Sequence, residues 1–189
     1  MSVFSMFYAV NNGKKVEVTD PTNYAQCFDL AVAWTDFLRI PRVWPYLYAY
    51  QIYTNFGPVQ AQYFDRIENG PDDIPLEGDV VVWGPRYNWG AGHVGVCTNS
   101  AGLWNLSVFV QNDPVYSPAH IRQYSYDNIL GWLRPKQQAS NADEYVKRVS
   151  DAIISAKNAI DTGEQVGDPK WKEKNTRNKT DLMRLSSRL

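Results

Sequence analysis

Cysteine and histidine are scarce in this sequence, which has 2 of each among 189 residues. Two cysteines are too few for a disulfide framework, so Cys27 and Cys97 each need their own explanation. No uninterrupted apolar run reaches the roughly 18 residues of a membrane span, and the first residues lack a basic region followed by an apolar one. We therefore expect a chain made in the cytoplasm without a signal peptide, and no membrane partner.

A strong excess of charge is also missing. Lys and Arg number 19 against 20 Asp and Glu, which leaves a net charge of -1 at pH 7. Such a balance argues against a nucleic-acid partner, because nucleic-acid binding needs a basic field. What the chain does contain is a hydrophobic fraction of 44% with 7 Phe, 7 Trp and 12 Tyr. That is enough for the packed core of one ordinary domain with a short appendage.

The residue pattern of the sequence changes near residue 136, because almost all strand-like runs lie before it. We therefore divide the chain into residues 1–136 and an extension at 137–189. In the extension, apolar residues at helical spacing predict a helix over 141–160 with one narrow apolar stripe. From Asp168 to the end, 7 basic residues stand against 3 acidic ones. A stripe this narrow cannot form a core alone, so we expect the helix to pack on the main domain or on another protein.

The main domain shows a helical pattern first and strand patterns afterwards. Apolar spacing over 24–38 predicts a helix that opens near Cys27 and ends before Pro41, and the aromatic-rich stretch 44–64 suggests a second helix and a loop. Short β-branched or aromatic runs then occupy 78–83, 92–97, 106–112 and 129–135. Because no helical spacers separate them, they predict an antiparallel sheet and an α+β fold.

Chemistry at the start of the helix centres on Cys27. A helix N-terminus stabilises a thiolate, and His93 at a strand start could serve as its base, with Asn112 at the next strand end orienting the imidazole. The alternatives are a buried thiol, a surface histidine and a turn asparagine. A zinc site built from the two cysteines and two histidines is disfavoured, because no CxxC or HxxxH pairing exists. Cys97 is expected to be a small buried residue.

Five separated segments together resemble a known family. They are QCFDLAVAW at 26–34, GDVVVWG at 78–84, GHVGV at 92–96, VFVQN at 108–112 and ILGWLRP at 129–135. In order and spacing they look like a CHAP domain, the cysteine, histidine-dependent amidohydrolase/peptidase family. The resemblance covers roughly residues 17–136.

The resemblance implies a papain-like CHAP fold that cleaves amide bonds of bacterial peptidoglycan, with the helix that carries the nucleophile packed on an antiparallel sheet. It makes Cys27 the nucleophile, His93 the general base and acid, and Asn112 the orienting residue. Gln26 would form an oxyanion hole with the backbone N–H of Cys27. Many members carry a glutamate two residues before the asparagine, where this chain has Val110, so a catalytic carboxylate at that position is absent.

Two further sets of residues are candidates for binding, and only the first of them follows from the resemblance. Some phage members bind Ca²⁺ just upstream of the nucleophile. Asp20 and Asp29 match that pattern, but the neighbouring ligand positions carry no carboxylates, so we expect no required cofactor. The aromatic residues Tyr87 and Trp89 flank the loop that leads to His93, and we expect them to contact the substrate.

The resulting expectation is a phage endolysin or virion-associated lysin that acts at the cell wall, either released through a holin or carried in the virion. Its partner would be peptidoglycan, with phage tail proteins as a further partner of the extension 137–189. The alternative is a virion structural component that uses the fold for wall penetration or wall binding. The presence of Cys27, His93 and Asn112 disfavours an inactive form. The sequence leaves open which amide bond is cleaved.

Overall fold

The computed structural model describes residues 2–19, 25–44, 48–136 and 154. The chain divides into one unit of residues 2–139 and a second that contains 140–189. Of the second unit only Ile154 is described, as a helical residue with an exposed side chain. The helix predicted over 141–160 and the basic tail otherwise lie outside the described residues. Within those residues no helix is long and apolar enough to cross a membrane.

Helix α2 (Cys27–Phe37) is the helix that the apolar spacing predicts. Leu30, Ala31 and Trp34 line one stripe and are fully buried. The Trp34 indole N–H also donates to the Gly78 carbonyl oxygen at 2.9 Å, which ties the helix to the chain just before the sheet. Arg39 then adopts a left-handed conformation (φ 59°), and the helix does not continue.

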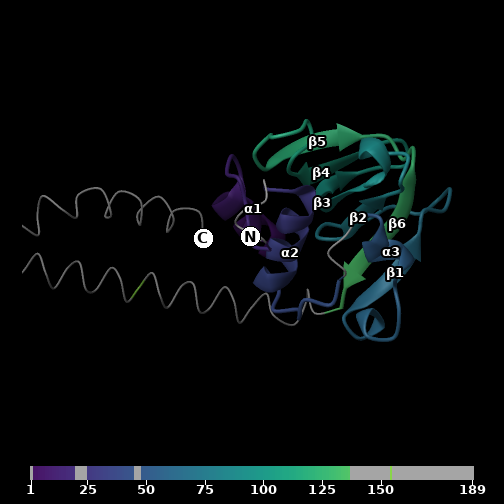
Figure 1. Cartoon of the computed structure of the whole chain (residues 1–189), viewed down its shortest axis with the longest axis horizontal. Coiled ribbons are helices and arrows are strands. Elements are labelled where there is room, and N and C mark those ends of the chain that lie inside the picture. The colour runs from purple at the N-terminus through teal and green to yellow at the C-terminus, as the bar shows by residue number, and fades with distance from the viewer. Residues whose placement is uncertain (1, 20–24, 45–47, 137–153, 155–189) are drawn as a thin grey trace, which may run out of the picture. The chain divides into compact units, whose positions relative to one another are not determined.

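An additional helix, α1 (Val3–Asn11), was not predicted from the sequence. Ser2 caps it by accepting a hydrogen bond from the Ser5 N–H at 3.1 Å, as helix-starting serines commonly do. Its aromatic residues Phe4 and Phe7 contact Trp34 of α2, with ring centroids 6.0 and 5.2 Å apart. Figure 1 accordingly shows α1 beside α2.

The sheet has six strands in the order β1-β6-β2-β3-β4-β5, and every neighbouring pair is antiparallel. The strands are β1 (Phe64–Glu68), β2 (Val80–Trp83), β3 (His93–Ala101), β4 (Leu106–Val110), β5 (His120–Tyr124) and β6 (Ile129–Pro135). The α+β fold with an antiparallel sheet is therefore confirmed. Helix α2 packs against β3, the strand that begins with His93.

The second helix and loop predicted in 44–64 are present, but the helix is short. In the described part of this stretch, α3 (Gln51–Thr54) and a 3₁₀ turn (Gln60–Gln62) form, and β1 begins at Phe64. The strands β1 and β5 were missed. Both are edge strands with mostly exposed side chains, so they lack the apolar runs that reveal buried strands.

The two faces of the sheet carry different parts of the core. On one face, Phe109 of β4 packs edge-on against Phe4 and Phe7 of α1. On the other, a second cluster is formed by Val81, Trp83, Cys97, Leu106, Val108, Val110, Ile129 and Trp132. Because alternate residues of a strand face opposite sides, His93 shares the face of Cys97, and it pairs directly with Trp83 across β2 and β3. His93 therefore projects into this second, aromatic-rich cluster.

Candidate active site

Cys27 is the first residue of α2 and is almost fully buried. Burial raises the pKa of its thiol to about 11, while the backbone N–H groups of Val94, Phe28 and Cys27 itself lower that pKa in part. The stabilisation of thiolate expected from the helix N-terminus is therefore present but outweighed by burial. At neutral pH the resting group is a thiol.

The same contacts place the Cys27 thiol beside β3. Val94 donates its N–H toward the sulfur, and Val94 directly follows His93. The packing of α2 on β3 thus brings the nucleophile next to the backbone that begins β3, whereas the His93 side chain lies on the sheet face that carries Cys97. The pairing of Cys27 with the His93 imidazole stays a prediction.

His93 has an unusual environment, because its side chain is only 1% exposed. Burial lowers the pKa of His93 to about 4; the nearby Asp113 carboxylate acts to raise it, and Arg122 acts to lower it. The ring stacks on Tyr87, with centroids 5.4 Å apart and planes 25° apart. Its Nε2 has no hydrogen-bond partner among the described residues and lies 3.8 Å from Asp113 Oδ2.

Gly92 allows the chain to reach His93. Its φ of 71° suits glycine, and a Cβ there would meet the Trp83 carbonyl oxygen at 2.6 Å and the Tyr50 Cβ at 2.9 Å. Tyr50 in turn donates its N–H to the Ala91 carbonyl oxygen at 3.4 Å. The loop around Tyr50 therefore lies directly against the entry to β3.

Asn112 contacts Gln26 in this structure. Its Nδ2 donates to Gln26 Oε1 at 2.8 Å, and its Oδ1 accepts from the Tyr116 N–H at 2.6 Å. Since Nε2 of His93 is unpartnered among the described residues, no hydrogen bond joins that atom to Asn112. The role predicted for Asn112, orienting His93, stays a prediction.

Gln26 is fixed at the start of α2 by several contacts. Its N–H donates to Asp29 Oδ2 at 2.8 Å, and its carbonyl oxygen accepts from Gln111 Nε2 at 2.8 Å. The bond from Asn112 occupies its side-chain oxygen. The side-chain NH₂ is then the remaining polar group of Gln26, next to the nucleophile in sequence, which is the donor that an oxyanion hole needs.

Asp113 is the residue of this site that the sequence reasoning missed. Its carboxylate accepts from the hydroxyls of Tyr87 and Tyr124 at 2.6 and 2.5 Å and from the Arg122 guanidinium at 2.6 Å. Burial acts to raise the pKa of Asp113, but these donors together with His93 hold it below its ordinary value. In the sequence Asp113 is simply a residue before a proline, typical of a turn, so no local signal distinguishes it.

The two aromatic residues predicted to contact substrate lie in different settings. Trp89 is 90% exposed and adopts φ 51°, so its ring is accessible to a ligand. Tyr87 instead stacks on His93 and donates its hydroxyl to Asp113. Burial, followed by Asp113, raises the pKa of Tyr87 to about 12, so it remains a neutral donor. Tyr87 thus belongs to the surroundings of the imidazole.

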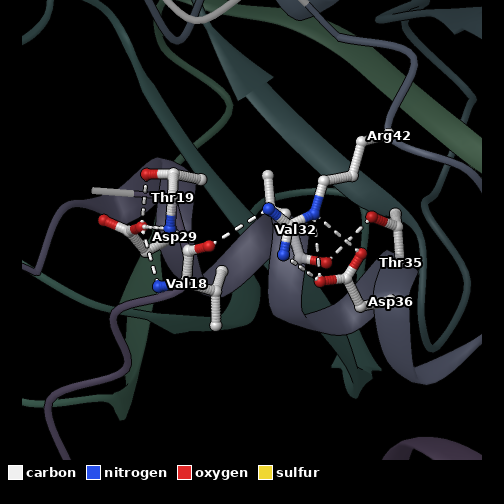
Figure 2. Close-up of polar contacts among 7 residues, drawn as sticks. All are labelled: Val18, Thr19, Asp29, Val32, Thr35, Asp36 and Arg42. Carbon is white, nitrogen blue, oxygen red and sulfur yellow. Dashed lines mark hydrogen bonds and ion pairs between the residues drawn. The ribbon is translucent and has the colours of Figure 1, made fainter. Parts of the chain in front are cut away.

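The calcium candidates do not form a ligand set among the described residues. Asp20 lies outside them. Asp29 is buried, and its carboxylate accepts hydrogen bonds from the N–H groups of Val18 and Thr19 and from the Thr19 hydroxyl (Figure 2). It also accepts from the Gln26 N–H. Calcium requires a shell of oxygen ligands, whereas amide donors surround this carboxylate, so Asp29 does not fit a calcium site.

No metal-binding group of three or more His, Cys, Asp or Glu occurs in the part of the chain that the structure describes. Cys97, which the zinc alternative required, is fully buried as predicted. Burial raises the pKa of its thiol to about 12. Its sulfur lies 3.2 Å from the Thr98 carbonyl oxygen, an acceptor that cannot stabilise a thiolate. Cys97 and Cys27 therefore differ in the groups that face the sulfur.

Comparison with known proteins finds similarity among solved structures. No family model matches the chain, and no curated protein matches it. Among solved structures, the crystal structure of a wild-type endolysin, LysIME-EF1, matches with a TM-score of 0.56 and 28% sequence identity. The match covers 74% of this chain and 65% of that one. In fold and in part of its sequence, the chain is therefore similar to an endolysin.

Proposed function

We propose that this protein is a peptidoglycan hydrolase of the CHAP type, a phage endolysin or virion-associated lysin that cleaves an amide bond with Cys27 as nucleophile. The observation that carries the proposal is the buried thiol at the start of α2, set against the Val94 N–H beside His93. Similarity to an endolysin structure points to the same substrate class. The likeness covers only part of that protein, so the bond that is cleaved has to be measured.

The proposed reaction begins with attack of the Cys27 sulfur on the carbonyl carbon of the amide. The thiol proton passes to His93, and the carbonyl oxygen becomes an oxyanion that the Cys27 N–H and the Gln26 side-chain NH₂ stabilise. Collapse breaks the C–N bond, and protonated His93 gives its proton to the leaving amine. Water then hydrolyses the thioester with His93 as base, which regenerates the thiol.

The two pKa shifts define when the proton moves. Burial raises the pKa of Cys27 to about 11 and lowers the pKa of His93 to about 4, so both groups are uncharged at rest. A charged pair is therefore formed only as the sulfur attacks, when the negative charge passes on to the substrate oxygen. On this basis the acid limb of kcat/KM falls well below the ordinary histidine pKa of 6.5.

The decisive experiment compares the two cysteines on purified cell walls. Cys27→Ala should lower hydrolysis by more than about a thousandfold, as removal of a nucleophile commonly does. Cys97→Ala is the matched control, because it removes the other buried thiol of the same domain and should retain turnover. Walls still cleared by Cys27→Ala would overturn the cysteine mechanism.

Mass spectrometry of the released fragments identifies the bond. A new amino terminus on L-alanine would show an amidase, and a new terminus within the stem peptide or cross-bridge would show an endopeptidase. Trp89→Ala should raise KM with little change in kcat, because Trp89 is exposed in the turn that precedes His93 and would contact the substrate without reacting. Wild-type protein that releases no new amine from any wall would contradict the proposed function.

A further inference from the structure

Asn112 and Asp113 are adjacent in the chain but act on different partners in the site. We propose that Asp113 is the positioning residue of His93, while Asn112 positions the side chain of Gln26. The inference rests on the proposed function and assigns the supporting roles within that same site. It also places a carboxylate next to the imidazole, although the chain has Val110 at the position where the resemblance to CHAP domains implies glutamate.

The position of the Asp113 carboxylate is strongly determined. Its Oδ2 accepts from both Tyr87 and Tyr124, and its Oδ1 accepts from Arg122. The side chain is only 15% exposed. Three donors from two different segments thus hold the carboxylate in one orientation, with Oδ2 directed at the imidazole.

His93 presents a buried polar atom to this carboxylate. Nε2 has no hydrogen-bond partner among the described residues, and Asp113 Oδ2 lies 3.8 Å away. The two tyrosine hydroxyls already occupy Oδ2, so its interaction with neutral His93 is through space. When His93 accepts the thiol proton, the same carboxylate faces a cation, and the attraction increases. Asp113 therefore stabilises the state that forms during catalysis more than the resting state.

Arg122 works against Asp113 at the imidazole. Among the described residues, the charged and titratable groups recorded against His93 are Asp113 from the loop after β4, Arg122 and Tyr124 from β5, and Tyr87 from the loop after β2. The Asp113 charge favours protonated His93, whereas the Arg122 charge disfavours it. Removal of one or the other should therefore shift the protonation of His93 in opposite directions, which a purely structural role would not do.

Asn112 is directed elsewhere. The Tyr116 N–H fixes its Oδ1, which leaves Nδ2 to donate to Gln26 Oε1 at 2.8 Å. That bond sets the orientation of the Gln26 amide, so that its NH₂ is the end available for an oxyanion. Asn112 also adopts a left-handed conformation (φ 59°), in which asparagine and aspartate are enriched, so Asn112→Asp preserves the backbone.

The test follows the two histidines of the full-length protein by NMR, with His120 as the internal reference. Asp113→Asn should lower the pKa of His93 by about one pH unit, whereas Arg122→Gln should raise that pKa. Asn112→Asp should change the His93 pKa less than either, because its carboxylate would face Gln26. Arg122 is substantially exposed, so Arg122→Gln should fold even if Asp113→Asn does not.

Kinetics on cell walls complete the test. The acid limb of kcat/KM should move to lower pH in Asp113→Asn and to higher pH in Arg122→Gln, whereas Asn112→Asp should lower kcat about tenfold to a hundredfold with that limb little displaced. An unchanged His93 pKa in both Asp113→Asn and Arg122→Gln would overturn the inference, as would a larger shift in Asn112→Asp. Because the NMR measurement needs no substrate, opposite shifts without wall cleavage would support the assignment of Asp113 and contradict only the proposed function.

Discussion

Two aspartates flank the candidate site, and they are bound in contrasting ways. Asp29 at the start of α2 is 2% exposed and accepts from backbone N–H groups and one threonine hydroxyl. Asp113 after β4 accepts from two tyrosines and an arginine and faces His93. The donors to Asp29 keep their protons at any working pH, whereas the neighbours of Asp113 include a cation and an imidazole.

Asp29 therefore fixes the position of the backbone, whereas Asp113 influences the protonation of His93. Asp29 binds the N–H groups of Val18 and Thr19 to the first turn of α2, and Arg42 binds the Val18 carbonyl oxygen at 3.1 Å while it also pairs with Asp36 (Figure 2). The segment before the nucleophile is thus attached at both ends of the helix. Buried amide donors determine geometry, while charged or titratable neighbours determine protonation.

The largest expected effect is loss of stability in Asp29→Ala. Removal of this acceptor leaves the part-buried N–H groups of Val18, Thr19 and Gln26 without it, which should lower the free energy of unfolding by about 3 kcal/mol. Urea unfolding at pH 7 measures it. Asp113→Asn is the matched comparison, and it should cost about 1 kcal/mol, because its side chain is partly exposed and the amide can still accept. The reverse order would refute the distinction.

The next effect concerns stability as a function of pH. Burial lowers the pKa of His93 to about 4 in the folded chain, against 6.5 when unfolded. Between these values the unfolded chain binds more protons, so the free energy of unfolding should fall by about 1 kcal/mol for each pH unit as pH drops from 6.5 to 4. The pKa of Asp113 is also lowered, so its protonation adds to this fall in the free energy of unfolding only at pH values below its ordinary pKa of 3.8.

The control for this pH dependence is His93→Gln, which cannot take up a proton. The variant should lose most of the slope between pH 6.5 and 4 in urea unfolding measured at several pH values, whatever its stability at pH 7. A slope that persists unchanged would show that His93 is not the group responsible.

A smaller effect is expected for Thr19→Val, which removes the hydroxyl that donates to Asp29 Oδ1 at 2.6 Å while it keeps the side-chain shape. The amide donors to Asp29 remain, so the loss should be about 1 kcal/mol in thermal or urea unfolding. Thr54→Val, at an exposed position in α3, should change stability by less than about 0.5 kcal/mol. Equal effects at the two sites would mean that the Asp29 cluster contributes nothing special.

The smallest expected effect is that of a chelator. Since N–H donors surround the Asp29 carboxylate, EDTA should leave both wall hydrolysis and stability unchanged. Activity is compared before and after dialysis against EDTA, with Ca²⁺ added back. A loss that only Ca²⁺ restores would show that ligands outside the described residues complete a site.

The elements that could be predicted from the sequence are those with buried apolar side chains. Helix α2 and the strands β2, β3, β4 and β6 have buried apolar residues, so spacing and composition reveal them. The edge strands β1 and β5 expose most of their side chains, and only pairing with a neighbour makes them strands. Helix α1 has a serine cap and an apolar stripe, a signal present in the sequence that was not recognised.

The candidate site divides in a similar way between sequence and tertiary structure. The sequence determined a cysteine at a helix start, a histidine at a strand start and a glutamine before the cysteine, because those positions depend on local caps, turns and periodicity. Only the tertiary structure decided that Asp113 faces His93 while Asn112 contacts Gln26. The donors that hold Asp113 come from β5 and from the loop after β2, and their convergence depends on strand pairing between distant segments. The tertiary structure also decided the protonation of Cys27 and His93, because burial sets their pKa values and exists only in the folded chain.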